Sequence, residues 1–518
     1  MTTGKFIFKA TLLIAFFKLM SQALGVVREA VIARLFGTSM ATDAYVIALR
    51  IPNMVFYIIG GALLTVIVPV FTEYYTRGEK AEAWKIFNTV INVVTLVFLA
   101  LTLIGIAGAP LLVKLLAPGF EGRAEWLTVE LARIILPLMV FTGLAHMFSN
   151  LLNANNIFGL PAFSQSVNNV FIIVFALTLG GLYGIHGLAL GTVLAAAAMA
   201  FVQYPVLHKT GFRLKFSIDL NHPGVKKVFY LALPAALGVA VRQGNVYVTS
   251  VLASWLPEGS ISALNFADKL VNFPVGFFVL ALGTAVFPTL AGRAAEGNSK
   301  AFAEILVGSL KAVLAGIIPA SIGFMVLSHP IVTLVYKGGA FNERSVIMTA
   351  AALLFYAFGL AGLAAAVLLE RSFYSFQDTR TPVKIGVAAV LINLAFSLIL
   401  VRPLQHGGLA LATSLSSLAY AGLLMICLEK KVSIFRGSGL LRFTAAVLAA
   451  SGVMAAASYG VNIATAGLIK GVAGLIMQVG LAVAAGVAVY AAVLLALKVD
   501  EVRLVLRAAG EAVKRRGT

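Results

Sequence analysis

The sequence predicts an all-α integral membrane protein of about fourteen transmembrane helices, with two parallel six-helix bundles and two additional C-terminal helices. Three observations predict this fold class. The 518 residues are 60% hydrophobic and only 11% charged, whereas soluble domains are ~25% charged. Apolar runs recur along the chain, and each can cross roughly 30 Å of hydrocarbon as a helix. The sequence also repeats itself at an offset of about 220 residues.

The apolar runs predict the following spans in chain order: 6–27, 44–73, 86–113, 127–153, 161–181, 185–208, 227–254, 261–291, 303–328, 345–369, 383–401, 406–428, 441–462 and 467–497. The first run begins near Phe6 and has no Ala-x-Ala-like cleavage site, so we expect a retained helix rather than a signal peptide. The tail after Asp500 can form a basic amphipathic helix on the cytoplasmic surface.

The positive charge predicts the topology. An even number of spans places both termini on one side, and about 25 Lys and Arg residues fall on that side against about 8 in the opposite loops. We therefore expect both termini to be cytoplasmic. The net charge of +19 is then a property of the cytoplasmic loops, so it does not indicate a nucleic-acid partner.

The internal repeat predicts the domain organisation. The matched segments, at an offset of about 220 residues, are Gly187–Thr192 with Gly408–Thr413, Pro161 with Pro382, Val68-Pro69 with Phe287-Pro288, and Arg50-x-x-Asn53 with Lys269-x-x-Asn272. The predicted domains are two six-helix lobes at 1–215 and 224–432, two additional helices at 439–498 and the cytoplasmic tail at 499–518. Since six is even, both lobes enter the membrane in the same orientation, which is typical of transporters that bind cargo between parallel repeats and work by alternating access.

Charged residues inside predicted spans need a reason, because a charge at membrane depth costs at least ~2.5 kcal/mol. Arg50 and Lys269 occupy equivalent positions in the two lobes and are interpreted as a pair across one cavity. The alternative is snorkelling, in which the apolar stem lets the charged group reach the lipid headgroups. Arg242 fits cavity lining and helix packing equally well.

The first helical hairpin is also rich in charge, and two readings stay open for it. One is a purely structural network of paired side chains. The other is a binding site, since the cations Arg28, Arg34, Arg50 and Lys269 outnumber the acids Glu29, Asp43 and Asp268. A surplus of positive charge suits an anionic cargo, and the planar guanidinium suits phosphate oxygens in particular.

Other polar residues indicate no catalysis. Arg133 is expected to pair with Glu130 within one helix, and His186 and His406 are expected to have turn roles. Cys427 is the only cysteine, and no carboxylate cluster accompanies the histidines, so no metal site is predicted. The sequence has no Gly-x-x-x-x-Gly-Lys-Ser/Thr loop and no nucleophile with its base, so we expect neither an enzyme nor a cofactor.

Several segments together resemble the MurJ (MviN) lipid II flippases. They are Gly-Val-Val-Arg-Glu at 25–29, Ala-Arg-Leu-Phe-Gly at 33–37, Ala-Thr-Asp-Ala-Tyr at 41–45, Arg-Ile-Pro-Asn at 50–53, Phe-Ala-Asp-Lys-Leu at 266–270, and the segment 371–382. The resemblance implies the fold of the multidrug/oligosaccharidyl-lipid/polysaccharide (MOP) exporter superfamily. It also implies a location in the bacterial cytoplasmic membrane.

The resemblance further implies a cargo and a site. The cargo would be an undecaprenyl-diphosphate-linked peptidoglycan precursor, moved from the cytoplasmic to the outer leaflet. The family's functional basic residues match Arg28, Arg50 and Lys269, and its functional acid matches Asp43. The predicted substrate-binding set is Arg28, Glu29, Arg34, Asp43, Arg50, Asn53, Arg242, Ser262, Asp268 and Lys269.

The chain departs from the family pattern in the second helix. Phe56 and Tyr57 stand where many members have two arginines, and Gly61 stands where a later Glu is common. The eleventh predicted helix contains no Asp or Glu, and neither does the seventh, which argues against the sodium site of some members. Coupling to the membrane potential or to another ion stays open.

Five functions are compatible with a membrane protein of this composition, and the charged residues separate them. Lipid II flipping leads, and export of another polyprenyl-diphosphate-linked saccharide, for a capsule or spore coat, is the alternative because the diphosphate is shared. Drug–cation antiport would require acidic residues in the cavity, whereas the predicted cavity is basic. A scaffold for cell-wall synthesis proteins leaves the intramembrane charges unexplained, and an enzyme acting on a lipid pyrophosphate lacks a nucleophile or metal cluster.

Overall fold

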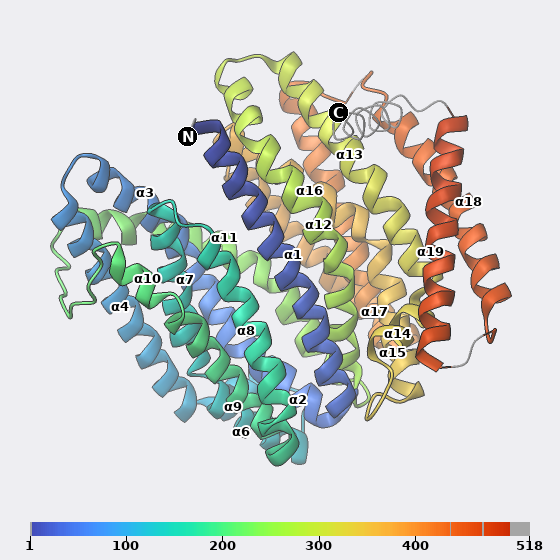
Figure 1. Ribbon diagram of the computed structural model, residues 1–518, viewed down its shortest axis with the longest axis horizontal. Helices are drawn as coiled ribbons and strands as arrows, with labels where there is room; N and C mark the ends of the chain where they lie inside the picture. The colour runs from blue at the N-terminus through green and yellow to red at the C-terminus, as the bar shows by residue number, and fades with distance from the viewer. Residues whose placement is uncertain (1–2, 436, 469–470, 498–518) are drawn as a thin grey trace. The chain divides into compact units, whose positions relative to one another are not determined.

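The computed structural model describes residues 3–435, 437–468 and 471–497, and within them the chain is helical. The β-pairing found in these residues is an isolated bridge between Gly338 and Phe341. The predicted tail at 499–518 lies outside the described residues. The predicted all-α fold class is thereby confirmed (Figure 1).

The helices follow one another with short connections. Their bounds are α1 (Thr3–Phe36), α2 (Met40–Val55), the π-helix η1 (Phe56–Gly60), α3 (Gly61–Thr76), α4 (Lys80–Ala107), α5 (Ala109–Leu116), α6 (Arg123–Ile135), α7 (Leu138–Ala154), α8 (Gly159–Leu177), α9 (Leu179–Phe201), α10 (Tyr204–Lys209), α11 (Pro223–Ala253), α12 (Ser260–Ala295), α13 (Ser299–Val326), α14 (Ser328–Tyr336), α15 (Glu343–Phe358), α16 (Leu360–Ser375), α17 (Arg380–Val432), α18 (Leu440–Thr465) and α19 (Gly471–Ala496).

Many of these helices are long and apolar enough to cross a membrane. In the described part of the chain there are ten such spans, or eleven when α15 and α16, bent by 45°, count as one. One of the ten is α17, which contains two helices joined at a kink at Gln405 and covers two predicted spans. The total of fourteen therefore stays a prediction.

The offset found in the sequence recurs in the helix bounds. Both ends of α4, Lys80 and Ala107, lie 219 residues before the ends of α13, Ser299 and Val326. The first residue of α8 lies 221 residues before the first residue of α17. Since helix ends depend on local caps and turns, matching bounds show that the two segments share their local structure.

The chain divides into two compact units. Unit 1 comprises Met1–Phe266 and Gly338–Ser345, and unit 2 comprises Ala267–Lys337 and Val346–Thr518. The predicted lobe boundaries, at 1–215 and 224–432, stay a prediction.

Small residues let the helices of unit 1 approach closely. Helix α8 packs beside α1 and α9 (Figure 1). At Gly191 of α9, an added Cβ atom would lie 2.4 Å from the Cβ atom of Phe175 on α8. Without water or a hydrophobic driving force between spans, such close backbone contact supplies much of the packing energy in a membrane.

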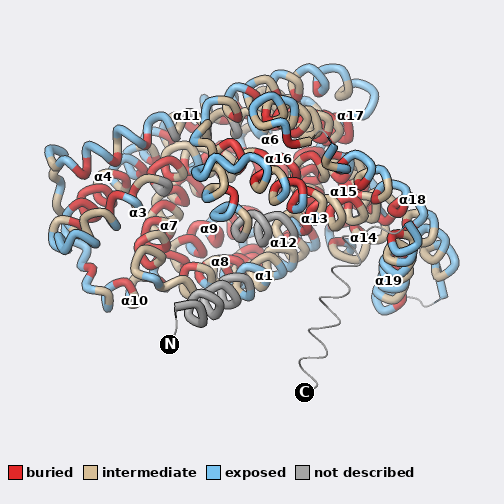
Figure 2. The backbone as a smooth tube through the Cα atoms, turned by 90° about the horizontal axis from the view of Figure 1, so that it is seen from above, coloured by how far each residue is buried: buried red, intermediate tan, exposed pale blue. Residues whose placement is uncertain are grey.

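The two additional helices pack on α13 in unit 2. A buried apolar cluster joins the three helices, and its members are Ile318, Phe443, Val447, Ala450 and Leu494. Tyr490 of α19 adds a hydrogen bond from its hydroxyl to the carbonyl of Ala315, at 2.7 Å. Apart from this contact face, α18 and α19 are largely exposed (Figure 2).

The first hairpin differs from the predicted one. Helix α1 continues to Phe36 instead of ending near residue 27, and α2 begins at Met40 instead of 44. The prediction was wrong because it ended the span before the charged pair Arg28-Glu29, whereas the turn comes at Gly37, which has φ 63°. Ser39 then caps α2 by accepting a hydrogen bond from the amide of Thr42. Arg28, Glu29 and Arg34 therefore project from a helix.

Candidate functional site

Arg28 is the centre of a polar cluster between α1 and α8. Its Nη2 atom lies 2.5 Å from Oε1 of Glu29, and its Nη1 atom donates to Oδ1 of Asn169 at 3.0 Å. The side chain of Glu29 is only 6% exposed, whereas that of Arg28 is 21% exposed. The ion pair lowers the cost of burying either charge, and part of the guanidinium remains accessible.

Asn169 was not among the predicted site residues. Besides accepting from Arg28, its amide nitrogen donates to the carbonyl of Ser21 at 2.9 Å. It thus fixes the orientation of the guanidinium relative to α1. The signal in the sequence was the pair of asparagines at 168–169 inside an apolar span, since a polar residue at membrane depth needs a partner.

Arg50 of α2 reaches α11. Its Nη1 atom donates to Oγ of Ser250 at 2.6 Å, and the Ser250 hydroxyl donates to the carbonyl of Val246. Asn53 lies one turn further along α2 and is half-buried. The guanidinium is therefore held by an uncharged partner at this contact.

Asp43 binds the start of α12. Its Oδ2 atom accepts from the amide of Gly259 and its Oδ1 atom accepts from the amide of Ser262, both at 2.7 Å. Asp43 and Ser262 are fully buried. A carboxylate here satisfies amide donors that the helix leaves unpaired, and it interacts favourably with the positive end of the helix dipole. The two predicted site residues are thus brought together, in a structural role.

Arg34 lies at the exposed end of α1, beside the turn at residues 338–341. Its carbonyl accepts from the amide of Ala340 at 2.8 Å. The turn approaches closely because Gly339 has no side chain: an added Cβ atom would lie 2.2 Å from the Arg34 carbonyl oxygen. The position of Arg34 is thus determined by backbone packing.

Asp268 and Lys269 lie on the part of α12 that belongs to unit 2, and both are half-buried. The Oδ1 atom of Asp268 accepts a hydrogen bond from the side-chain amide of Asn272 at 2.8 Å, within the same helix. The predicted pairing of Lys269 with Arg50 across a cavity stays a prediction. The side chain of Arg242 lies outside the described part of the structure.

Phe56 and Tyr57, which stand where many family members have two arginines, belong to an aromatic cluster. Phe56 is buried in η1, and its ring stacks on His146 of α7 with centroids 5.1 Å apart. It also contacts Tyr57 and Phe98. This stretch of the helix packs by aromatic contacts and adds no positive charge to the site.

A further polar contact was not expected from the sequence. The hydroxyl of Tyr45 lies 2.8 Å from Oγ1 of Thr192, which ties α2 to α9.

The predicted pair of Arg133 with Glu130 was wrong. Arg133 donates to the carbonyl of Ile106, and Glu130 lies 3.2 Å from Nε2 of His186, because both side chains reach neighbouring helices.

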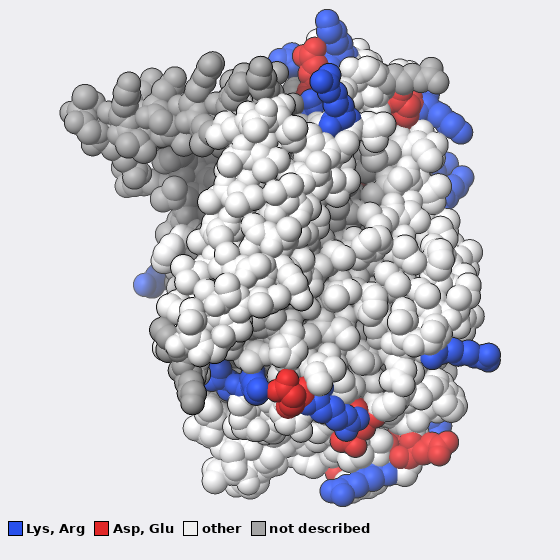
Figure 3. Space-filling view, turned by 90° about the vertical axis from the view of Figure 1, so that its right-hand side faces the viewer, with Lys and Arg blue, Asp and Glu red and all other residues white. Residues whose placement is uncertain are grey.

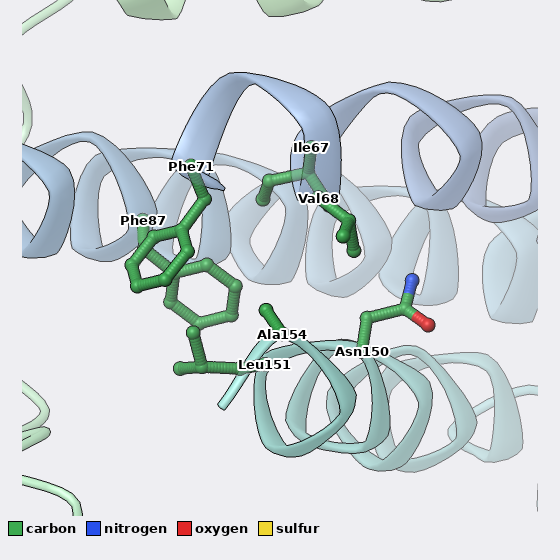
Figure 4. Close-up of a pocket in the computed structure, with 7 residues that line it drawn as sticks. All are labelled: Ile67, Val68, Phe71, Phe87, Asn150, Leu151 and Ala154. Carbon is green, nitrogen blue, oxygen red and sulfur yellow. The ribbon is translucent and has the colours of Figure 1, made fainter. Parts of the chain in front are cut away.

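A small apolar crevice, too narrow to hold a water-sized molecule, lies between α3, α4 and α7. Figure 4 shows its lining residues, which are Ile67, Val68, Phe71, Phe87, Asn150, Leu151 and Ala154. With no charged residue, it is unsuited to a diphosphate. Among the described residues, no three His, Cys, Asp or Glu side chains gather as metal ligands. Ion coupling stays untested.

Charged side chains on the surface follow the pattern of a membrane protein. On the face shown in Figure 3, Lys, Arg, Asp and Glu gather mainly at the two ends, and the broad surface between them carries other residues. Such a band matches the uncharged surface that hydrocarbon requires.

Comparison with known proteins gives concordant results. The family model described as lipid II flippase MurJ matches residues 32–496. The lipid II flippase MurJ of Burkholderia cenocepacia is 30% identical over 458 residues, covering 87% of this chain and 89% of the relative. The probable lipid II flippase MurJ of Vibrio cholerae is 31% identical over 437 residues, covering 82% and 83%.

Solved structures agree. A lipid II flippase MurJ in an inward closed conformation superposes with a TM-score of 0.79 at 25% identity, covering 93% of this chain and 98% of that one. An inward-facing multidrug resistance MATE family transporter of the MOP superfamily superposes with a TM-score of 0.69 at 12% identity, covering 82% and 98%. The second likeness shows the fold alone.

Proposed function

The chain belongs to the lipid II flippase MurJ family, and from this premise we propose that it moves lipid II across the membrane. Lipid II is the undecaprenyl-diphosphate-linked precursor of peptidoglycan. The proposed direction is from the cytoplasmic to the outer leaflet of the bacterial inner membrane, by alternating access. The proposal makes the chain a transporter and not an enzyme, with both termini in the cytoplasm.

The placement of Arg28 is the observation that supports this proposal most directly. It lies on α1, is held from two sides by Glu29 and Asn169, and remains partly exposed. A guanidinium held in one orientation loses little conformational entropy when it binds a phosphate. The planar fork can then donate two parallel hydrogen bonds to phosphate oxygens.

Arg50 is proposed as a second cationic group for the diphosphate, oriented by its hydrogen bond to Ser250. Lys269, in the second unit, is proposed from the sequence as a further cation for the cargo. Asp43, which is occupied by amides at the start of α12, would stabilise the protein around the site and not touch the cargo.

Complementation tests the proposal in cells. In bacteria depleted of their own flippase, the wild-type chain is expected to restore growth, and Arg28→Ala is expected to abolish it. Arg28→Lys keeps the charge but loses the fork, so we expect partial growth. Lys300→Ala, at an exposed lysine of α13, is the matched control and should grow normally. Full growth with Arg28→Ala and Lys269→Ala combined would contradict the mechanism.

A reconstituted assay tests the cargo. Purified protein in vesicles should translocate labelled lipid II faster than a labelled polyprenyl diphosphate that carries another saccharide. Equal or faster transport of the second lipid would favour a capsule or spore-coat exporter. Running the assay with and without a membrane potential, and with and without sodium, identifies the energy source.

A further inference from the structure

The segment between α10 and α11 is held along α4 in unit 1. It follows Lys209 and ends at His222, before Pro223 begins α11. His222 lies 2.9 Å from Glu82 of α4, and Asp219 forms an ion pair with Lys85 at 2.8 Å. The backbone of the segment therefore follows the surface of a membrane-spanning helix.

Two buried asparagines on α4 hold this segment. The side-chain amide of Asn88 donates to the carbonyl of Arg213, and its oxygen accepts from the amide of Lys215. Asn92, one turn further, donates to the carbonyls of Lys215 and Ser217 at 2.7 and 3.1 Å. A loop in water would need no such partners, whereas backbone groups shielded from water must be satisfied by protein.

These contacts give the position of the segment along α4. Asn92 lies twelve residues into α4 from Lys80, which corresponds to roughly 18 Å along the helix axis. Trp84, a residue type enriched at the membrane–water boundary, contacts Phe212 with ring centroids 5.8 Å apart. The tip near Phe216 therefore lies about two turns further along α4 than this tryptophan.

The exposed side chains of the segment alternate in character. Leu214, Phe216, Ile218 and Leu220 are all exposed, and Phe216 is 80% exposed. The residues that alternate with them are polar, and Arg213 and Lys215 are exposed. Alternation with a period of two places the apolar and basic groups on opposite sides of an extended chain. Large apolar groups presented outward in this way fit a lipid environment.

The charge of the segment is one-sided. Lys209, Arg213 and Lys215 have no acidic partner among the described residues, whereas Asp219 and Glu82 are engaged by Lys85 and His222. By the distribution of basic residues this end of the protein faces the cytoplasm, where the leaflet is rich in anionic lipid. The phosphates of anionic lipids in that leaflet carry the complementary charge.

We propose that residues 209–220 form an interfacial binding site for anionic phospholipids of the cytoplasmic leaflet. Leu214, Phe216 and Ile218 enter the boundary between headgroups and acyl chains. Lys209, Arg213 and Lys215 bind the phosphate groups of the same lipids. The site is separate from the transport site around Arg28 and does not depend on the identity of the cargo.

A fluorescent probe tests the insertion. In the full chain with Cys427→Ser, Phe216→Cys is labelled with an environment-sensitive fluorophore and the protein is placed in phosphatidylcholine–phosphatidylglycerol vesicles. We expect blue-shifted emission that is quenched by lipid-attached nitroxide and not by aqueous iodide. Glu79→Cys, in the exposed turn before α4, is the control and should show the opposite pattern. Quenching of the label at position 216 by iodide alone would overturn the insertion.

Native mass spectrometry tests the lipid specificity. The triple variant Lys209→Gln, Arg213→Gln, Lys215→Gln should retain phosphatidylglycerol with an affinity lowered roughly tenfold or more, with phosphatidylcholine binding unchanged. Lys300→Gln, Lys384→Gln, Lys430→Gln removes three exposed lysines elsewhere and should bind as the wild type does. Equal phosphatidylglycerol binding by the first triple variant and the wild type would overturn the proposal, as would an equal loss in the control triple.

Discussion

Gly184 of α9 and Gln405 of α17 have almost the same backbone conformation, at φ 60° and ψ −141° and at φ 48° and ψ −129°, although they lie 221 residues apart. Each breaks a helical run three residues before a glycine. The repeat in the sequence is therefore also a repeat of irregular backbone geometry. This agreement would be improbable for two unrelated helix pairs, because non-glycine residues adopt positive φ only in a few per cent of cases.

The kink at Gln405 predicts a stabilising substitution. A side chain in this conformation costs about 1 kcal/mol or more, and glycine adopts it readily. Gln405→Gly is expected to raise the free energy of unfolding by about 1 kcal/mol, and Gly184→Ala to lower it by a similar amount. Thermal unfolding in detergent measures both. A lower unfolding temperature for Gln405→Gly would contradict the argument.

Gly187 and Gly408, the glycines that follow the two kinks, predict equal losses of stability on substitution. An added Cβ atom would lie 2.0 Å from the carbonyl oxygen of Leu179 at Gly187, and 2.1 Å from that of Leu400 at Gly408. Since backbone cannot give way cheaply, each substitution to Ala should destabilise by about 1–3 kcal/mol. The controls are Gly181→Ala and Gly422→Ala, where no atom lies within 4 Å of the added group, and they should unfold as the wild type does.

The contact of Asp43 with α12 predicts graded effects on stability. Asp43→Ala leaves the amides of Gly259 and Ser262 buried without a partner and should lower the free energy of unfolding by about 1–2 kcal/mol. Asp43→Asn keeps one accepting oxygen and should lose less. Chemical denaturation compares the two variants. Equal loss in both would show that the charge, and not the hydrogen bonds, provides the stabilisation.

Asn88 and Asn92 of α4 are expected to protect the segment between α10 and α11 from proteolysis. Asn88→Ala and Asn92→Ala each remove hydrogen bonds to the backbone near Arg213 and Lys215. We expect trypsin in detergent to cleave this segment several-fold faster in either variant. Thr95→Ala, on the same helix and without a hydrogen bond to the segment among the described contacts, is the control. Unchanged cleavage in both asparagine variants would show that other contacts hold the segment.

The ion pair of Asp219 predicts that the protection of neighbouring amides from exchange is lost in acid. The hydrogen bond and charge of Lys85 hold the pKa of Asp219 below its usual value of 3.8. A lowered pKa means that the contact stabilises the segment above about pH 4 and is lost as the pH falls further. Amide exchange at Asn221 and His222, whose N–H groups donate to Asp219, should therefore lose protection below about pH 4. Asp219→Asn should show, at every pH, the low protection that the wild type reaches only in acid, and a profile like that of the wild type would refute the assignment.

The class of the protein was visible in the sequence because it rests on local properties. Composition and apolar run length predict membrane-spanning helices, since each span must satisfy its own backbone. The repeat and the motifs around Arg28 and Asp268 are also contiguous stretches of chain, so they indicate the family without any knowledge of contacts. Helix ends were predicted less well. In α1 the predicted span ends before the charged residues Arg28 and Glu29, because the sequence does not show that Asn169 provides a partner for Arg28 inside the protein.

The partners of the site residues were decided only by the tertiary structure. Asn169 holds Arg28, Ser250 holds Arg50, and the start of α12 holds Asp43. Each contact joins residues more than a hundred positions apart. Their meeting depends on how helices pack, and packing arises from the summed fit of many side chains. The sequence alone determined that these charges need partners; the packing of the helices decided which groups those partners are.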